Sequence, residues 1–281
     1  MAVISVVIPA LNDAAMLRTC LEALRAQTRP PDEIVVVDNG STDDTAAVAA
    51  SAGARVIDEP RRGIPAATAA GFDAARGDLI ARLDADSVPP AGWIATLETR
   101  FENDATLAAL TGPGEFYGAG RLVRRMGEVL YIGGYFWSMG WLLGHPPLFG
   151  SNFAIRATTW RRIRQTSHRD VRELHDDLDF SFQFQPDMRV DYDRDLVVGV
   201  SARPFGTIRG FFRRLHWAYT TIAVNSRQQP LLERRAERRR WERGTPPPRT
   251  LPVPTFETDF DPGFAADLGP DEFGQGLEPR A

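Results

Sequence analysis

The chain has 281 residues and 43% of them are hydrophobic, so it can bury one large core or two closely joined halves. Its formal net charge of −4 excludes a protein that binds nucleic acid through bulk positive charge, although all 33 basic residues are arginines. The single cysteine, Cys20, excludes an internal disulfide and indicates a reducing compartment.

Two further absences bear on localisation. No stretch of the sequence reaches the roughly 18 uncharged apolar residues of a membrane span. The first residues run directly into a strand-like segment without a basic leader, so no secretory signal is predicted. We therefore expect a cytoplasmic protein, with peripheral contact at the inner face of the membrane as an open alternative.

Strand and helix patterns alternate over the first part of the chain. The predicted strands cover residues 3–8, 34–37, 55–57, 79–83 and 107–111, and helical patterns lie between them. Cys20 falls on the apolar face of the first helix, which predicts a packed, inert thiol. This alternation predicts an α/β protein with a parallel sheet and right-handed crossovers. Neither Gly-x-x-x-x-Gly-Lys-Ser/Thr nor Gly-x-Gly-x-x-Gly occurs after the first strand, so any nucleotide must be held another way.

The second part of the chain is less regular. Residues 130–143 are uncharged, aromatic and spaced by glycines, which predicts a buried helix, with an interfacial segment or a wall for an apolar acceptor as alternatives. Residues 203–243 hold 11 arginines against three glutamates, and this segment could face phosphate, an anionic membrane or solvent. Residues 244–281 are rich in Pro, Gly and acidic side chains, and we expect a disordered or loosely packed tail.

Two carboxylates, Asp84 and Asp86, follow the predicted strand at residues 79–83. The carboxyl end of a strand in an open α/β sheet is where ligands bind. Carboxylates this close repel each other unless a cation or solvent compensates, and a divalent cation shared with a diphosphate would do so. A solvated turn is the alternative, because Asp and Ser also favour turns.

Several motifs in the first part resemble those of glycosyltransferase family 2. Residues 7–13 (Val-Ile-Pro-Ala-Leu-Asn-Asp) resemble the opening strand and loop of that family. Residues 34–44 resemble its second strand with an Asp-x-Gly-Ser-x-Asp loop, and residues 83–86 (Leu-Asp-Ala-Asp) resemble its metal-binding Asp-x-Asp.

Two weaker motifs continue the resemblance, which covers about residues 3–219. Gly150, Ser151 and Asn152, followed by Arg156, are similar to the acceptor-side Gly-x-Asn…Arg loop. Asp176 and Asp177 are similar to the Glu-Asp catalytic pair.

The resemblance implies a GT-A fold, with a Rossmann-like, mostly parallel mixed sheet. It implies a nucleotide-sugar-binding half at residues 1–112 and an acceptor-binding, catalytic half at residues 113–243, joined by one continuous sheet. The implied activity is transfer of a sugar from a UDP- or GDP-linked donor to an unknown acceptor, with a lipid-linked acceptor as an open alternative, usually with inversion. The implied cofactor is a divalent metal, Mn²⁺ or Mg²⁺, which would stabilise the leaving diphosphate.

The resemblance also assigns roles to residues. Asp177 would be the base that deprotonates the acceptor hydroxyl, with Asp176 as a substitute. Asp86 would bind the metal, together with Asp84 and, if not simply structural, His216. The implied nucleotide-sugar contacts are Pro9, Ala10, Asn12, Asp13, Asp38, Arg62, Asp84, Ala85 and Asp86. The implied acceptor or diphosphate contacts are Gly150, Ser151, Asn152, Arg213 and Arg214, because guanidinium groups suit phosphate oxygens.

The sequence departs from the family pattern in two places. Many members read Ala-Arg-Asn in the third helix, where this chain has Ala67, Thr68 and Ala69, so the role of that arginine is lost or falls to Arg61 or Arg62. The Gln-x-x-Arg-Trp of processive synthases is missing, which argues against such a synthase. Two alternatives stay open: a polyprenyl-phosphate glycosyltransferase at the membrane surface, and a non-catalytic nucleotide-sugar-binding protein.

Overall fold

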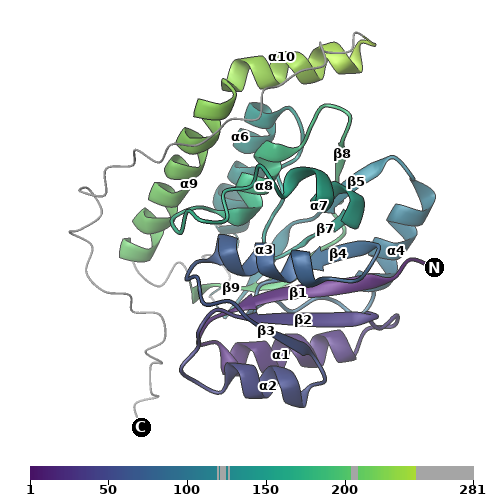
Figure 1. The fold of residues 1–281 in the computed structure, drawn as a ribbon, viewed down its shortest axis with the longest axis vertical. Helices are drawn as coiled ribbons and strands as arrows, with labels where there is room; N and C mark the ends of the chain where they lie inside the picture. Colours follow the sequence, from purple (N-terminus) through teal and green to yellow (C-terminus); the bar gives the residue numbers. More distant parts are fainter. Residues whose placement is uncertain (119, 121–124, 126, 204–207, 245–281) are drawn as a thin grey trace.

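A seven-stranded sheet forms the centre of the computed structural model, which describes residues 1–118, 120, 125, 127–203 and 208–244 (Figure 1). Its strands run in the order β3-β2-β1-β4-β7-β5-β8. Strand β7 is antiparallel to both of its neighbours, and the other strand pairs are parallel. The strands are β1 (Ile4–Ala10), β2 (Glu33–Asp38), β3 (Arg55–Asp58), β4 (Leu79–Arg82), β5 (Leu107–Thr111), β7 (Phe153–Arg156) and β8 (Arg189–Tyr192). A second, parallel pair joins β6 (Gly114–Tyr117) to β9 (Val198–Ser201).

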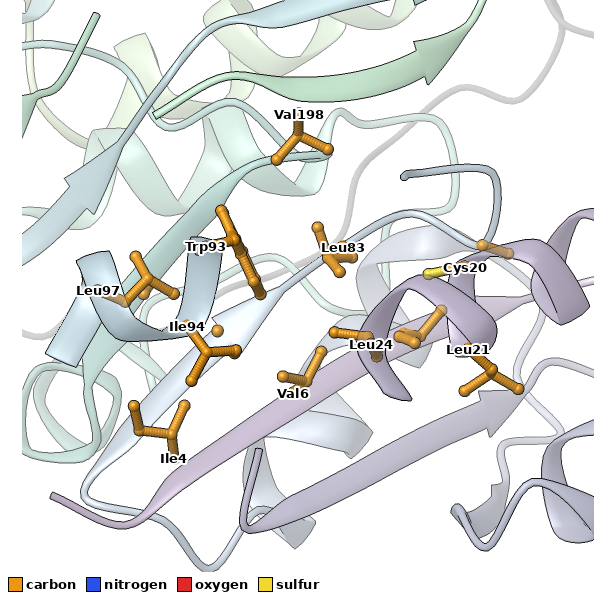
Figure 2. Packing of buried hydrophobic residues seen from close by; sticks show 14 of the residues in the cluster. Ile4, Val6, Cys20, Leu21, Leu24, Leu83, Trp93, Ile94, Leu97 and Val198 are labelled. Carbon is orange, nitrogen blue, oxygen red and sulfur yellow. The ribbon is translucent and has the colours of Figure 1, made fainter. Parts of the chain in front are cut away.

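Helices cover both faces of the sheet. One apolar cluster joins β1 to α1 (Ala14–Arg25), α2 (Thr45–Ser51) and α4 (Trp93–Asn103). The other cluster joins the opposite face to α3 (Ile64–Ala74), α7 (Ala157–Ile163) and α8 (Asp176–Gln183). Figure 2 shows Cys20 of α1 within the first cluster, and it is fully buried, as predicted. Burial raises the pKa of its thiol well above the usual value, so the thiol stays protonated.

The strands and their order of appearance match the sequence expectation closely. All five predicted strands form, and the α/β class with a mostly parallel mixed sheet is confirmed. Strand β7 is the exception to the parallel pattern, because it enters between β4 and β5 in the opposite direction. The predicted tail at 244–281 falls outside the described residues from 245 onward.

The segment at residues 130–143 is not a buried helix. It forms the end of a π-helix, η1 (Gly127–Gly133), followed by α6 (Gly134–Leu143). One side of α6 packs on α8, where its residues meet Leu178 and Phe182. The other side exposes Trp137 by 77% and Trp141 by 55%. The prediction was wrong because an uncharged composition does not require every side of a helix to be covered, and the elements packed on α6 leave Trp137 and Trp141 exposed.

Two long helices follow the sheet. The first, α9 (Ile208–Gln228), packs on α8, and the second, α10 (Leu231–Glu242), packs on α6 (Figure 1). A buried hydrogen-bond network ties α9 to α8, since Asn225 Nδ2 donates to Asp179 Oδ1 over 2.9 Å. Of the helices in the described ranges, none has the length and apolar composition needed to cross a bilayer.

The sheet register gathers the predicted site at one edge. The parallel strands β1, β2 and β4 all end at this edge. Because β7 runs antiparallel to β4 and pairs Phe153 with Arg82, the loop that precedes β7 lies at the same edge. Residues 150–152 are therefore brought beside the carboxyl end of β4, as expected for a binding site in an α/β sheet.

Candidate active site

The loops after β1 and β2 hold each other in place. Asn12 has a φ of 52°, a conformation that Asn tolerates better than most residues. Its side-chain oxygen accepts a hydrogen bond from the Thr42 N–H over 2.7 Å, and its own N–H donates to Ser41 Oγ over 3.0 Å. The Ser41 N–H in turn donates to Asp38 Oδ1 over 2.9 Å. The two loops thus fix the carboxylate of Asp38 at the end of β2, next to the buried Pro9 and Ala10 of β1.

Of the two arginines before α3, only one faces this loop pair. The guanidinium of Arg62 lies over Gly40, where an added Cβ would meet Arg62 Cζ at 3.4 Å. Arg61 instead pairs with Glu59 at 3.1 Å and with Asp170 at 2.7 Å. Arg62 is therefore placed to reach a ligand above the Asp38 loop, whereas Arg61 is engaged elsewhere.

The two aspartates after β4 have different surroundings. Asp84 Oδ1 lies 2.9 Å from Arg82 Nη2, and Asp84 Oδ2 accepts a hydrogen bond from Ser151 Oγ over 2.5 Å. The side chain of Asp86 is more buried than that of Asp84. Burial, and then the charge of Asp84, raise the pKa of Asp86 to about 6. The peptide unit between them is buried at Ala85, so both carboxylates are held on a rigid turn.

Arg203 lies two residues after the end of β9 and connects two residues that are predicted to contact the donor. Its Nη1 lies 2.8 Å from Asp13 Oδ1, and its Nη2 lies 3.1 Å from Asp86 Oδ2. A backbone bridge between Val88 and Gly199 holds β9 against the loop after β4 and so brings Arg203 to the site. Sequence reasoning missed this residue, since its role depends on a long-range pairing that no local motif signals.

A second arginine that sequence reasoning missed lies inside the site. Arg82 is the last residue of β4 and is only 2% exposed. Its Nη2 lies 2.9 Å from Asp84 Oδ1 and 3.2 Å from Asp176 Oδ2. Its Nε has no hydrogen-bond partner in the part of the chain that the structure describes. The only sequence signal was a charged residue inside an apolar strand, directly before the two aspartates.

The predicted catalytic pair begins α8. Asp176 is nearly fully buried, and Thr68 Oγ1 of α3 donates a hydrogen bond to Asp176 Oδ2 over 2.6 Å. Asp177 is half-buried, and its Oδ2 accepts the Gly150 N–H over 2.7 Å. Burial, and then the neighbouring Asp176, raise the pKa of Asp177 above the usual aspartate range. The structure thus brings the predicted catalytic pair, the loop at residue 150 and the end of β4 together.

Asn152 is brought to the same edge but points into the protein. It is fully buried, and its Oδ1 accepts a hydrogen bond from Trp93 Nε1 over 2.9 Å. Its Nδ2 donates to the carbonyls of Pro113 and Leu196, at 3.0 and 2.5 Å. The contacts of Asn152 therefore hold the loop before β7, whereas Gly150 and Ser151 face the aspartates.

The candidates on α9 make contacts of a different kind. His216 Nε2 lies 3.7 Å from Glu173 Oε2. The carboxylate that the structure places beside His216 is therefore Glu173, and not Asp84 or Asp86 of the predicted metal site. The guanidinium of Arg213 stacks 5.8 Å from the Trp217 ring centroid, and the Arg214 carbonyl accepts a hydrogen bond from His175 Nε2. Within the described ranges, no group of three or more His, Cys, Asp or Glu side chains is arranged to hold a metal.

Residues 5–172 match the model of the protein family described as glycosyl transferase family 2. The chain belongs to this family. An uncharacterized glycosyltransferase of Mycobacterium tuberculosis (strain H37Rv) is 42% identical over 104 residues, which are 37% of this chain and 46% of that protein. A glucosyl-3-phosphoglycerate synthase of the same organism is 34% identical over 96 residues, 31% of this chain and 30% of the synthase. The chain therefore spans less than half the length of these relatives.

Solved structures show the same fold. A mannosyltransferase from Pyrobaculum calidifontis, in complex with GDP-Man and Mn²⁺, superposes with a TM-score of 0.63 at 19% identity, covering 84% of this chain and 70% of that one. The Mycobacterium tuberculosis glucosyl-3-phosphoglycerate synthase, in complex with Mn²⁺, UDP and phosphoglyceric acid, superposes with a TM-score of 0.56 at 20% identity, covering 80% and 78%. The expected GT-A fold is thereby confirmed.

Proposed function

We propose that this protein is a metal-dependent, inverting glycosyltransferase that moves a sugar from a UDP- or GDP-linked donor to an acceptor hydroxyl. The observation that carries the proposal is the gathering of Asp38, the Asp84/Asp86 pair and Asp177 at one edge of the sheet. Membership of the family supports a nucleotide-sugar donor. The edge also matches the place where ligands bind in open α/β sheets.

In this proposal the loops after β1 and β2 hold the nucleoside. Asp38 would accept from the base, and Asn12, Asp13 and Arg62 line the same loop pair. The backbone of Pro9 and Ala10 provides the floor, because both residues are buried in β1. Rigid, mutually hydrogen-bonded loops suit a nucleoside site, since little ordering is left to occur on binding.

Asp84 and Asp86 fit a divalent cation. Mn²⁺ and Mg²⁺ take oxygen ligands, and Mg²⁺ is commonly held by one or two carboxylates together with substrate phosphates. Burial, and then the charge of Asp84, raise the pKa of Asp86, and a bound cation would stabilise the ionised carboxylate against both. When bound, the metal would supply Lewis-acid stabilisation of charge on the leaving diphosphate. Arg203 adds positive charge beside the same carboxylate.

Asp177 is the base in this proposal. Inversion needs a carboxylate that removes the proton of the acceptor hydroxyl as its oxygen bonds to the anomeric carbon, while the bond from that carbon to the nucleoside diphosphate breaks on the opposite face. A raised pKa makes Asp177 a stronger base than an ordinary aspartate. Asp176 is almost completely buried and bound to Arg82 and Thr68, so it positions the site rather than meeting the substrate.

Two variants test this function against the non-catalytic alternative. Donor hydrolysis or sugar transfer is measured for the wild type, Asp86→Ala and Asp177→Asn, with Mn²⁺ or Mg²⁺ and a panel of nucleotide sugars. We expect turnover by the wild type and strong losses in both variants. Full activity in both variants would overturn the site assignment, and a wild type that binds donors without turnover would favour the non-catalytic protein.

A lipid-linked acceptor is the second candidate, and α6 and α10 favour it. Trp137 and Trp141 are exposed on α6, and the Arg235 guanidinium of α10 lies 4.4 Å from the Trp141 ring centroid. A cavity of about 440 Å³ opens between these helices. It is lined in part by Phe136, Tyr192, Arg235, Arg238 and Arg239. Exposed tryptophans beside arginines are typical of surfaces that bind anionic membranes.

Helix α6 also contacts the loop that leads into the candidate active site. The ring of Phe136 lies 6.2 Å from that of Phe149, and Tyr135 donates a hydrogen bond to the Leu148 carbonyl over 2.6 Å. Residues 148 and 149 lead directly to Gly150, which binds Asp177. A membrane-bound acceptor docked at α6 would therefore lie close to the proposed base.

Liposome flotation tests this second candidate. Vesicles of neutral and of anionic lipid are compared for the wild type, a Trp137→Ser/Trp141→Ser double variant and a control, Val3→Ser, which changes an exposed apolar residue at the start of β1. We expect the wild type and the control to float with anionic vesicles and the double variant to lose this. Equal flotation of all three proteins, or no flotation with any lipid, would overturn the proposal of a lipid-linked acceptor.

A further inference from the structure

We propose that Arg82 is a positioning residue that locks the donor-side carboxylate of Asp84 and the acceptor-side carboxylate of Asp176 into one arrangement. The inference rests on the proposed function, because it assigns the two carboxylates to opposite sides of the transfer reaction. It goes beyond that function because Arg82 belongs to none of the motifs that identify the site.

The burial of Arg82 is the first observation. A guanidinium that is 2% exposed is costly unless it is paired, and Arg82 forms ion pairs with two carboxylates of the described residues through Nη2. Its Nη2 takes both carboxylates, at 2.9 Å from Asp84 and 3.2 Å from Asp176, so one nitrogen fixes their separation. If Arg82 followed a shift of one carboxylate, the other carboxylate would lose its ion pair with Nη2.

The packing of Gly150 is the second observation. A Cβ at Gly150 would lie 2.3 Å from Arg82 Nη1 and 3.1 Å from Asp177 Oδ2. Any side chain at this position would therefore displace the guanidinium, and only glycine leaves it in place. The Gly150 N–H donates to Asp177 Oδ2, so Arg82 also packs against the backbone that holds the proposed base.

The charge balance is the third observation. Burial and the charge of Asp176 raise the pKa of Asp177, whereas His175, Arg82 and the Gly150 N–H lower it. In α3, Thr68 contributes only a hydroxyl, which donates to Asp176. Arg82, from β4, supplies positive charge beside the carboxylate of Asp176.

Arg29 offers a matched control outside the candidate site. Its side chain is mostly buried, like that of Arg82, and it also joins two carboxylates. Its Nη1 lies 2.8 Å from Asp32 Oδ2, and its Nη2 lies 3.2 Å from Glu98 Oε1. Neither carboxylate belongs to the proposed site, so removing Arg29 tests the loss of a paired arginine by itself.

The test compares Arg82→Met and Arg82→Lys with Arg29→Met. Two readouts are used: steady-state kinetics with the donor, and ¹³C titration of aspartate carboxylates by NMR, which needs no turnover. For Arg82→Met we expect about a 100-fold loss of kcat, the scale of an ångström-sized misplacement. We also expect the Asp177 titration to move to higher pH, because a nearby positive charge is lost. Arg82→Lys should recover part of the Asp177 titration shift and less of the kcat loss, while Arg29→Met should change neither kcat nor the Asp177 titration.

Unchanged kcat and an unchanged Asp177 titration in folded Arg82→Met would overturn the proposal. If Arg82→Met does not fold, a double-mutant cycle that combines Gly150→Ala with Arg82→Lys tests the proposal. We expect Gly150→Ala to lower kcat in the wild type and much less in Arg82→Lys, because the two sites are coupled. Equal losses in both backgrounds would overturn it. A wild type that turns over no donor would overturn the proposed function, whereas the titration would still decide the role of Arg82.

Discussion

Arg203 Nη2 lies 3.1 Å from Asp86 Oδ2, so an arginine supplies positive charge at the carboxylate proposed to bind the metal. Because the guanidinium and a cation compete for the negative charge of this carboxylate, Arg203→Gln should tighten Mn²⁺ binding by the nucleotide-free protein. We expect a gain of about two- to fivefold, the scale of an exposed ion pair. Electron paramagnetic resonance of free Mn²⁺ measures it.

The matched control for this change is Arg61→Gln, which removes another exposed arginine with two carboxylate partners. Its Mn²⁺ affinity should equal that of the wild type. Weaker Mn²⁺ binding by Arg203→Gln would contradict competition between the arginine and the metal.

Replacing the proposed base should separate catalysis from donor binding. Asp177→Asn keeps the shape of the side chain but removes the proton acceptor, so kcat should fall by about 10²- to 10⁴-fold. Donor affinity, measured by calorimetry, should stay within about threefold, because Asp177 binds the acceptor-side loop at Gly150. A larger kcat loss in Asp176→Asn than in Asp177→Asn would show that Asp176 is the base.

The pH dependence follows from the raised pKa of Asp177. A base must be deprotonated to act, so kcat should fall as the pH is lowered through the pKa of Asp177. This acid limb of the pH–rate profile should lie above the usual aspartate range. In Asp176→Asn a neighbouring negative charge is lost, which lowers the pKa of Asp177 and moves the limb to lower pH. A pH–rate profile of both proteins measures this, and a limb that moves upward in the variant would contradict the assignment.

The hydroxyl of Thr68 should matter for stability. It donates to the buried Asp176, and Thr68 is fully buried itself. Thr68→Val keeps the shape but removes a donor, so the free energy of unfolding should fall by about 1–3 kcal/mol. Urea denaturation measures the change. Thr99→Val is the control, because the exposed Thr99 hydroxyl only bonds a carbonyl within its own helix, and equal losses in both variants would refute this role.

Much of the fold could be read from the sequence because it depends on local patterns. β-Branched runs between helical segments gave the strands of the parallel part, and the Asp84/Asp86 pair could be placed at the end of β4. The reversed direction of β7 and the exposed face of α6 could not be read, since both depend on which elements pack together.

The candidate site was predictable only in part, for the same reason. Asp176, Asp177 and Gly150 belong to short motifs, and the structure brings them together. Arg203 pairs with residues more than 100 positions away, and Arg82 joins its near neighbour Asp84 to Asp176, 94 positions further on, so no local spacing signals either role. Asn152 belongs to a predicted site motif but faces inward. Its side-chain amide bonds Trp93 and two backbone carbonyls, and these contacts hold the loop in place.

The most direct test of the central claim is a thermal-shift measurement with UDP- and GDP-sugars, with Mn²⁺ and with a chelator, on the wild type and Asp86→Asn. Ligand binding to the folded protein raises its apparent stability, so we predict that one class of nucleotide sugar raises Tm of the wild type only when Mn²⁺ is present. Asp86→Asn should lose this increase. In the chelated protein, Asp86→Asn should itself raise Tm at pH 7.5, because a carboxylate whose folded pKa is raised to about 6 costs stability when it is ionised. A wild type that no nucleotide sugar stabilises, or a stabilisation that persists in Asp86→Asn or without Mn²⁺, would contradict the account.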